Sequence, residues 1–235
     1  MRSLVLASSS PYRRQILERL GLPFRWQAPG IDESLKPNEA PETLVQRLAL
    51  AKAKALAPQY PDALIIGSDQ VAVLDGEILG KPGSFELAQK QLLAASGRSV
   101  EFFTGLCLLN SGTSIAQVHC EPFRVHFRTL TQSQVNAYLK KEQPYDCAGS
   151  FKAEGLGICL FQRLEGEDPN ALIGLPLIAL IDLLHREGVD PLDPSAQPCR
   201  SSPAGPALPV LPARNEPRNE TSTAGSIIGA TSTAR

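Results

Sequence analysis

The sequence lacks the features that mark membrane proteins and nucleic-acid-binding proteins. Its net charge of -1 provides no overall positive field to attract nucleic acid or an anionic membrane. Its most apolar stretch, residues 171–184, is interrupted by Gly174, Pro176 and Asp182 and falls short of the roughly 20 apolar residues of a membrane-spanning helix. The apolar residues 4–7 are too few for the core of a signal peptide. We therefore expect a cytoplasmic protein with neither a membrane nor a nucleic-acid partner.

Cysteine is scarce, and its spacing excludes the common zinc and redox motifs. The chain has five cysteines, an odd number, and no pair shows the C-x-x-C spacing. We expect them to be small buried side chains in a reducing compartment. With 43% hydrophobic and 20% charged residues, the composition is that of a globular protein of one large domain or two small ones.

The C-terminal part of the chain lacks aromatic residues and differs in composition from the rest. Residues 191–235 are rich in proline and repeat short segments such as Arg-Asn-Glu and Thr-Ser-Thr-Ala. Such a segment buries too little apolar surface to offset its chain entropy. The sequence therefore predicts a folded domain over residues 1–190 and a disordered, low-complexity tail over residues 191–235, with a specific docking role for the tail as the alternative.

Strand and helix patterns alternate along the first 190 residues. Apolar runs bounded by turn residues predict strands over residues 3–7, 63–67, 71–74, 98–109, 115–128 and 157–162. Helical periodicity and capping residues predict helices over residues 11–20, 41–57, 84–95, 131–141 and 175–187. This mixture predicts an α/β fold with a mixed sheet and not a regular doubly wound one.

A serine-rich loop follows the first predicted strand. Ser10 and Pro11 predict the start of a helix, so free backbone N–H groups and the positive end of the helix dipole face this loop. Arg13 and Arg14 fall in the first helical turn, where the dipole disfavours cations. A phosphate bound between the two arginines would resolve this conflict, because serine hydroxyls, amides and guanidinium groups all donate to it. The alternative is a pair of solvated surface arginines.

Glu33 and Lys52 each belong either to a binding site or to an ordinary solvated surface. Glu33 lies beside Asp32 in a loop, where a carboxylate would ligate a hard cation or simply be solvated. Lys52 lies eight positions after Leu44 and four after Leu48, so it continues the apolar stripe of its helix. A lysine there either extends outward to solvent or presents its ammonium group to an internal site.

A polar cluster, Gly67-Ser68-Asp69-Gln70, follows the predicted strand over residues 63–67. Open α/β sheets hold functional groups just beyond the ends of their strands. Asp69 in such a loop would orient a water molecule or hold a metal ion. An ordinary turn is the alternative.

Two glycine-containing segments suit contacts with a nucleotide. Gly80-Lys81-Pro82 is not a P-loop, because the spacing from Gly76 is one residue short and Pro82 stands where a Ser or Thr is needed. Lys81 in this rigid bend still suits a phosphate contact. The segment 149–157 contains three glycines that allow close approach of a ligand, and Glu154 within it would accept hydrogen bonds from a base edge. A glycine-rich turn with surface charges is the alternative.

Taken together, these segments resemble the Maf-like nucleotide pyrophosphatases from Leu4 to about Gly188. Residues 6–14 (Leu-Ala-Ser-Ser-Ser-Pro-Tyr-Arg-Arg), Gly-Ser-Asp-Gln and Gly-Lys-Pro look like the signature blocks of that family. The resemblance implies an elongated central mixed sheet with flanking helices and a cleft between two lobes, similar in shape to the inosine-triphosphate pyrophosphatases. It also implies a small-molecule nucleotide as substrate, a divalent cation (Mg²⁺ or Mn²⁺) as cofactor, and a homodimer.

The resemblance also implies roles for individual residues. Asp69 would be the general base and, with Glu33, a metal ligand. Four other residues would bind the substrate's phosphates, namely Ser8, Arg13, Lys52 and Lys81.

Three further positions distinguish branches of the family. Tyr12, Gln70 and Glu154 resemble the branch that hydrolyses 7-methyl-GTP, whereas the dTTP and UTP branch carries Arg, Thr and Gln there. A purine methylated at N7 is cationic and stacks well on an aromatic face, and a glutamate accepts from the guanine N1–H and amine. This branch is expected to carry Trp where the chain has Tyr12, which stacks less strongly.

Three alternatives stay open from the sequence. They are a dTTP or UTP pyrophosphatase of the same family, a nucleotide-sensing regulator of cell division, and a simple nucleotide-binding module.

Overall fold

The computed structural model describes residues 2–193. Nearly all of the predicted tail, residues 194–235, lies outside the described residues. Within residues 2–193, seven strands form one sheet in the order β2-β1-β3-β5-β6-β7, with β4 paired to β3. The strands are β1 (Ser3–Ala7), β2 (Phe24–Gln27), β3 (Ala63–Leu74), β4 (Glu77–Leu79), β5 (Ser99–Asn110), β6 (Ile115–Phe127) and β7 (Phe161–Gly166).

The sheet is mixed, as the sequence predicts. β1 runs parallel to both β2 and β3, whereas β3 is antiparallel to β4 and β5, and the remaining pairs are antiparallel as well. The central strands β3, β5 and β6 are 12, 12 and 13 residues long, which makes the sheet elongated. The predicted α/β class is therefore confirmed.

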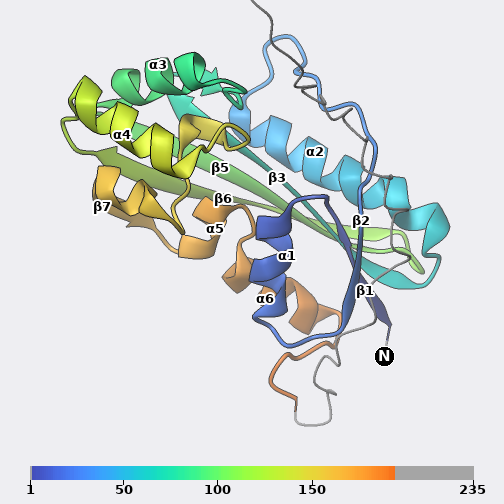
Figure 1. Ribbon diagram of the computed structural model, residues 1–235. Coiled ribbons are helices and arrows are strands. Elements are labelled where there is room, and N and C mark those ends of the chain that lie inside the picture. Colours follow the sequence, from blue (N-terminus) through green and yellow to red (C-terminus); the bar gives the residue numbers. More distant parts are fainter. Residues whose placement is uncertain (1, 194–235) are drawn as a thin grey trace, which may run out of the picture. The chain divides into compact units, whose positions relative to one another are not determined.

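Helices cover both faces of the sheet. They are α1 (Pro11–Glu18), α2 (Pro41–Leu56), α3 (Phe85–Ala95), α4 (Gln132–Glu142), α5 (Pro169–Ile173) and α6 (Leu177–Arg186). Side chains of β3 alternate between the faces: Ile65 and Val71 pack with α2, whereas Leu64 packs with α1 and α6 and Ala72 packs with α3 and α4. Figure 1 shows α1 and α6 in one group and α3 and α4 in another. These two groups on one face are the predicted two lobes.

Most of the predicted helix starts are confirmed by their caps. The Ser10 side chain accepts the Arg13 N–H at 3.4 Å, with Pro11 as the first helical residue of α1. Thr131 and Gln134 form a reciprocal capping box at the start of α4. These are local signals, because a hydroxyl side chain satisfies backbone donors that the helix itself leaves free.

One strand differs from the sequence prediction in a way that matters for function. The two predicted strands 63–67 and 71–74 are a single continuous strand, β3, so the Gly67-Ser68-Asp69-Gln70 cluster lies within a strand and not in a loop after it. Consecutive side chains of a strand point to opposite faces. Asp69 therefore lies on the α2 face, and Gln70 lies on the face covered by α5.

The C-terminal third also departs from the prediction. The predicted strand 157–162 is mostly a 3-10 helix, η3 (Leu156–Leu160), and β7 begins only at Phe161. The predicted helix 175–187 begins at Leu177, and the short helix α5 precedes it. Asp168 explains this pair of helix starts, because its carboxylate accepts the Asn170 N–H and the Ile178 N–H, each at 2.8 Å.

Helix α2 packs unusually close to the sheet because two glycines lie beneath it. A Cβ atom added to Gly67 would lie 2.0 Å from the Ala49 carbonyl oxygen, and one added to Gly105 would lie 2.2 Å from the Val45 carbonyl oxygen. Any larger residue would force the helix away from β3 and β5. This close packing brings the residues of α2 within reach of Asp69, which is paired with Gly105 across the strands.

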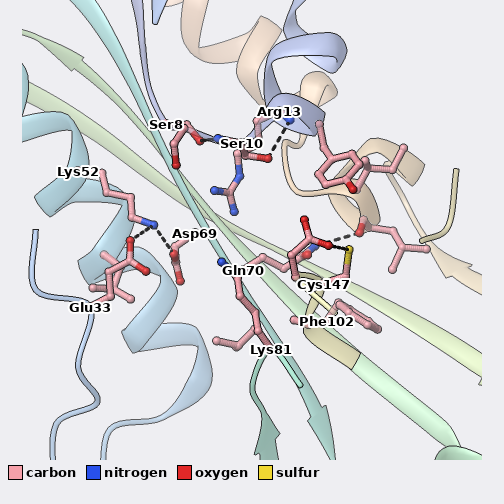
Figure 2. A pocket seen from close by; sticks show the side chains of 18 of the residues that line it. Ser8, Ser10, Arg13, Glu33, Lys52, Asp69, Gln70, Lys81, Phe102 and Cys147 are labelled. Carbon is pink, nitrogen blue, oxygen red and sulfur yellow. Dashed lines mark hydrogen bonds and ion pairs between the residues drawn. The ribbon is translucent and has the colours of Figure 1, made fainter. Parts of the chain in front are cut away.

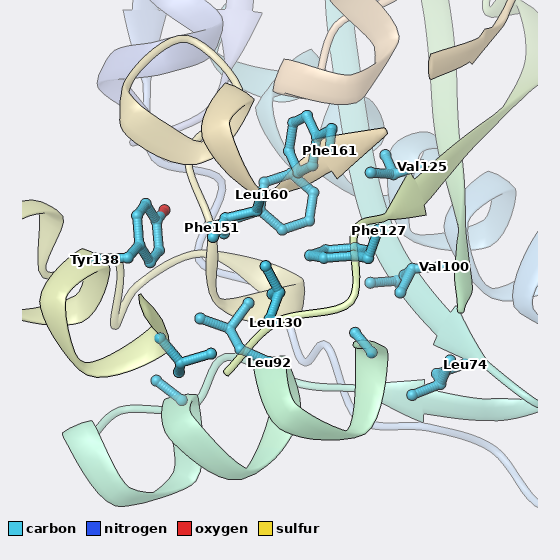
Figure 3. Close-up of a cluster of buried hydrophobic side chains, with 14 of the residues drawn as sticks. Leu74, Leu92, Val100, Val125, Phe127, Leu130, Tyr138, Phe151, Leu160 and Phe161 are labelled. Atoms are coloured by element: carbon cyan, nitrogen blue, oxygen red, sulfur yellow. The ribbon is translucent and has the colours of Figure 1, made fainter. Parts of the chain in front are cut away.

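An aromatic cluster fills the core of the lobe that contains α3 and α4, which we call the second lobe (Figure 3). The Phe151 ring lies edge-on to Phe102, Phe127 and Phe161, with ring centroids 5.3, 5.6 and 4.8 Å apart. Each such aromatic pair adds about 0.5–1.5 kcal/mol beyond the area it buries. Phe151 therefore anchors the segment that leads into Glu154.

The cysteines among the described residues carry free thiols. Cys107 is buried, as the sequence predicts, but Cys120 and Cys147 are only partly buried and Cys159 is exposed. The prediction of buried side chains is therefore wrong for Cys159 and holds only in part for Cys120 and Cys147. Cys199 lies outside the described residues.

Candidate active site

The site lies at a gap in the sheet beside β3. On one edge of β3, pairing with β1 ends at Gly67 and pairing with β4 begins at Ala72. Residues 68–71 therefore have no strand neighbour on that edge. The loop after β1 starts at Ser8 and the bend after β4 contains Lys81, so both segments diverge from β3 at this gap.

A cavity of about 620 Å³ opens at this gap. It is bounded by the start of α1, by α2 and the loop before it, and by residues 146–154 of the second lobe. Its walls include every site residue predicted from the sequence: Ser8, Tyr12, Arg13, Glu33, Lys52, Asp69, Gln70, Lys81 and Glu154. The structure thus brings together residues that are up to 146 positions apart, between Ser8 and Glu154.

Lys52 lies between two carboxylates (Figure 2). Its Nζ atom is 2.6 Å from Asp69 Oδ1 and 2.8 Å from Glu33 Oε1. The Lys52 side chain is only 6% exposed and that of Asp69 11% exposed. Of the two sequence alternatives for Lys52, the internal one is therefore confirmed.

The pKa of Glu33 depends on the charges of the whole cluster around Lys52. Burial raises the pKa of Glu33, but the hydrogen bond and charge of Lys52, with the charges of Lys81 and Arg13, outweigh burial and hold that pKa below its ordinary value. Three cations thus act on one carboxylate. An anionic ligand would reduce their mutual repulsion, so the cluster suits a phosphate-bearing molecule.

Arg13 is held in place by the backbone of the segment after α5. Its Nε atom donates to the Gly174 carbonyl oxygen at 2.8 Å, and the buried Ser68 hydroxyl donates to the same oxygen at 2.9 Å. Burial lowers the pKa of Arg13, and the charges of Asp69 and Glu33 oppose that shift. With Nε engaged by the protein, the terminal guanidinium nitrogens are left to meet a ligand in the cavity.

Arg14 does not share this site, which corrects the prediction of an anion between two arginines. The Arg14 guanidinium lies 4.8 Å from the centroid of the Trp26 ring on β2. Residues 13 and 14 point in different directions because successive helical residues are turned by about 100°. Only Arg13 faces the cavity.

The serine loop presents polar groups at the start of α1. The Ser8 side chain accepts the Ser10 N–H at 3.1 Å, and Ser8 itself is buried. This bond shapes the loop so that the first turn of α1 faces the cavity. A helix N-terminus offers free N–H groups to an anion.

The donor set of Glu33 and Asp69 fits a hard divalent cation. Each carboxylate uses one oxygen for Lys52, which leaves a second oxygen on each. Among residues 2–193, no group of three or more His, Cys, Asp or Glu side chains is arranged to hold a metal ion. Mg²⁺ usually binds one or two carboxylates and completes its shell with water and substrate phosphates, so two carboxylates fit that ion.

The opposite end of the cavity is less charged and contains residues that the sequence did not indicate. Tyr12 faces Asp146, Cys147 and Ala148 there, and Glu154 lies on the same wall. Burial, then the neighbouring Cys147 and Asp146, raise the pKa of Tyr12. Burial also raises the pKa of the Cys147 thiol to about 12, so this thiol stays protonated. No motif surrounds Asp146 or Cys147, and only their position just before the glycine-rich segment could have drawn attention to them.

Gln70 faces both the cavity and the protein. Its amide nitrogen donates to the Ala171 carbonyl at 2.7 Å and is within 3.0 Å of the Thr104 hydroxyl and 3.1 Å of the Leu172 carbonyl. These bonds tie β3 to α5 and fix the orientation of the amide. The Gln70 side chain therefore presents its oxygen, an acceptor, to any ligand beside it, and its role in specificity stays a prediction.

A protein family and several named relatives are similar in sequence to this chain. The family model described as Maf-like protein matches residues 3–187. A relative from Pseudomonas syringae pv. tomato, named "7-methyl-GTP pyrophosphatase", is 63% identical over 189 residues, which are 80% of this chain and 98% of that protein. Relatives with the same name from Pseudomonas aeruginosa and Colwellia psychrerythraea are 60% and 57% identical, over 81% and 82% of this chain and 99% and 96% of theirs.

Among solved structures, the Ham1 protein of Staphylococcus aureus is similar over 80% of this chain and 100% of its own. Its TM-score is 0.45 at 14% identity, a distant similarity. Separately, no helix within residues 2–193 is long and apolar enough to cross a membrane.

Proposed function

The chain belongs to the Maf-like protein family, and from that premise we propose that it hydrolyses 7-methyl-GTP to 7-methyl-GMP and diphosphate. The relatives that carry this activity in their names match at 57–63% identity over nearly their whole length. The observation that carries the proposal is the cavity beside residues 68–71, with a charged cluster at one end and Tyr12 and Glu154 at the other. Its volume of about 620 Å³ lies within the range of small-molecule sites.

The chemistry is assigned to the charged end. Asp69 takes a proton from a water molecule, the water oxygen forms a bond to the α-phosphorus, and the bond from that phosphorus to the bridging oxygen of the diphosphate breaks. Lys52 holds Oδ1 of Asp69 at 2.6 Å. Oδ2 has two acceptor positions, one that would hold the cation and one that receives the proton. Arg13 and Lys81 then stabilise charge that develops on the phosphate oxygens, the main source of rate in phosphoryl transfer.

A divalent cation is part of this proposal. Glu33 and Asp69 would hold it, and it would neutralise phosphate charge when bound. Ser8 and the N–H groups at the start of α1 would contact the same phosphates.

Recognition of the base is assigned to the other end. The N7-methylated purine is cationic, and the Tyr12 ring offers it an aromatic face. The Glu154 carboxylate accepts hydrogen bonds from the guanine N1–H and exocyclic amine, a donor pair that pyrimidines lack. The Gln70 oxygen is a further acceptor among the groups that line the cavity.

The test is a panel of nucleoside triphosphates, including 7-methyl-GTP, GTP, dTTP and UTP, whose products are separated by chromatography with and without EDTA. The proposal expects 7-methyl-GMP and diphosphate as products, the highest kcat/KM for 7-methyl-GTP, and no turnover in EDTA until Mg²⁺ or Mn²⁺ is restored. Faster turnover of dTTP or UTP would contradict the substrate. Binding without any product would contradict the enzyme and favour a sensor or binding module.

Three further features belong to the proposal. We propose that residues 1–190 are the catalytic domain, that the protein acts as a homodimer, and that it acts in the cytoplasm. Sedimentation of the full chain and of residues 1–190, together with their kcat/KM values, tests the first two. A monomeric active species, or loss of activity without residues 191–235, would contradict them.

A further inference from the structure

Glu142 occupies a position that its helix does not favour. It is the last residue of α4, where the partial negative charge of the helix C-terminus repels a carboxylate. Its side chain is nevertheless only 18% exposed. A charged group held in an unfavourable and largely buried position needs compensating partners, and those partners all belong to the segment that carries Glu154.

The Glu142 carboxylate is fixed against residues 152–156. Its Oε2 atom accepts the Leu156 N–H at 2.9 Å. Its Oε1 atom is 3.9 Å from the Lys152 Nζ, which also donates to the Glu142 backbone carbonyl at 3.2 Å. Hydrogen bonds to a charged acceptor are stronger than those between neutral groups.

Gly155 shows how closely the carboxylate fits. A Cβ atom at this position would lie 2.8 Å from both carboxylate oxygens of Glu142. Glu142 thus fills the space beside the residue that directly follows Glu154. A second residue of α4 adds to this contact, because the Tyr138 hydroxyl accepts the Lys152 N–H at 3.0 Å.

Lys152, which contacts Glu142, also interacts with Tyr12. Burial lowers the pKa of Lys152, but the charge and hydrogen bond of the Tyr12 hydroxyl, with Cys147 and Asp146, raise it above its ordinary value. Lys152 therefore interacts with α4 on one side and with Tyr12 on the other. Tyr12 and Glu154 both line the base end of the cavity.

We infer that Glu142 is a positioning residue for base selection: from outside the cavity, it holds the Lys152–Leu156 turn so that Glu154 and Tyr12 are set for one nucleobase. This inference rests on the proposed function and adds a residue to its specificity. Glu142 does not line the cavity, so its effect passes through Glu154 and Lys152. The chemistry at Asp69 does not depend on it.

The experiment measures kcat and KM of the full-length protein for 7-methyl-GTP and UTP. In Glu142→Ala, the ratio of the two kcat/KM values falls about tenfold, through a higher KM for 7-methyl-GTP, as expected for loss of a charged hydrogen bond. The kcat for UTP stays unchanged. Glu142→Gln keeps an acceptor for the Leu156 N–H and retains most of the ratio. Lys141→Ala, at the exposed neighbouring position, is the matched control and leaves the ratio unchanged.

A double-mutant cycle separates positioning from a general loss of stability. In a Glu154→Ala background, Glu142→Ala produces a much smaller further loss of the ratio, because most of its effect acts through the side chain already removed. A full additional loss in that background would overturn the inference. So would an equal fall of kcat/KM for both nucleotides, or a ratio that does not change in Glu142→Ala.

Three outcomes need their own readouts. If Glu142→Ala does not fold, Glu142→Asp replaces it, because the shorter side chain keeps the charge but withdraws from Leu156; a fall in the ratio of about threefold supports the inference, and an unchanged ratio overturns it. If the wild type prefers another base, the proposed substrate is wrong, and the ratio is then taken between the best and poorest nucleotides. If the wild type hydrolyses none, the same ratio is taken from Kd values measured by equilibrium dialysis.

Discussion

The two ends of the cavity are built from different kinds of structure. At the phosphate end, Asp69 lies on β3, Arg13 on α1 and Lys52 on α2, and Lys52 is 2.6 Å from Asp69 and 2.8 Å from Glu33. Ser8, Glu33 and Lys81 join them from loops. At the base end, Tyr12 lies on α1, but the wall that it faces is made by the loops and short 3-10 helices of residues 146–157, which are tied to α4 by hydrogen bonds such as that of Leu156 to Glu142. Side chains on regular elements are held more precisely than those on loops.

The two ends of the cavity act on different parts of the substrate. The triphosphate is the same in every candidate substrate, so the groups that act on it gain from rigid support on the sheet and its helices. The base is what differs among nucleotides, and Glu154 faces it from a non-regular segment that is positioned by contacts with α4 such as those of Lys152 and Leu156. Substitutions at the two ends should therefore change different kinetic quantities.

The largest expected effect is at Asp69. Asp69→Asn removes the proton acceptor but keeps the size of the side chain, so kcat falls at least about 1000-fold for every nucleotide. The ratio of kcat/KM between 7-methyl-GTP and UTP stays unchanged. Steady-state kinetics and thermal unfolding measure both effects.

The matched control for this variant is Asp62→Asn, which lies on the surface and leaves turnover unchanged. Retention of half the activity in Asp69→Asn would refute the assignment of Asp69 as the base. A change in the substrate ratio would remove the distinction between the two ends.

The next largest effect is at Lys52. Lys52→Met removes a cation from between two carboxylates and should lower kcat about 100- to 1000-fold for all nucleotides. The pKa of Glu33 should rise, because Lys52 provides its principal opposing charge, and NMR titration of the Glu33 carboxyl measures this. Lys54→Met, on the exposed side of the same helix, is the control, and equal losses in both variants would contradict the assignment.

A smaller effect, confined to selection, is expected at Glu154. Glu154→Ala removes the acceptor for the guanine edge and should lower kcat/KM for 7-methyl-GTP about 10- to 100-fold. The kcat for UTP should remain within about twofold of wild type, because the phosphate end is intact. If turnover of both nucleotides falls equally, the two ends do not act separately.

The smallest effect concerns pH. The pKa of Glu33 lies below its ordinary value, so the carboxylate remains charged when the pH falls to the range where a free glutamate takes up a proton. Its contribution to stability is present above the unfolded-state pKa and is lost as the pH falls through the lower folded-state pKa. Thermal unfolding of wild type and Glu33→Gln from about pH 7 to about pH 3 measures the difference, which should shrink toward the acid end. A difference that grows as the pH falls would contradict this sign.

The sequence alone predicts the structure where the signal comes from neighbouring residues. Ser10 and Thr131 mark helix starts because their hydroxyl groups cap nearby N–H groups. The nine site residues implied by the resemblance to a family all line one cavity. Their individual roles remain predictions.

The features that the sequence did not predict depend on contacts between distant parts of the chain. The cluster around Asp69 reads as a loop because its polar residues interrupt an apolar run, and only the pairing of β5 along the whole of β3 makes it a strand. Lys52 fits either a solvated or an internal position until Gly67 and Gly105 bring α2 onto the sheet. Glu142 carried no motif, because its partners are ten to fourteen positions along the chain.

The continuous strand β3 also limits how this protein can change its length. Asp69 and Gln70 are adjacent in the sequence but serve opposite faces, and Gly67 fixes the strand beneath α2. Deleting or inserting one residue between Gly67 and Asp69 would exchange the faces, turning an amide toward Lys52 and a carboxylate toward the carbonyls of α5. Descendants of this sequence should therefore accumulate substitutions along the strand but not single-residue insertions or deletions.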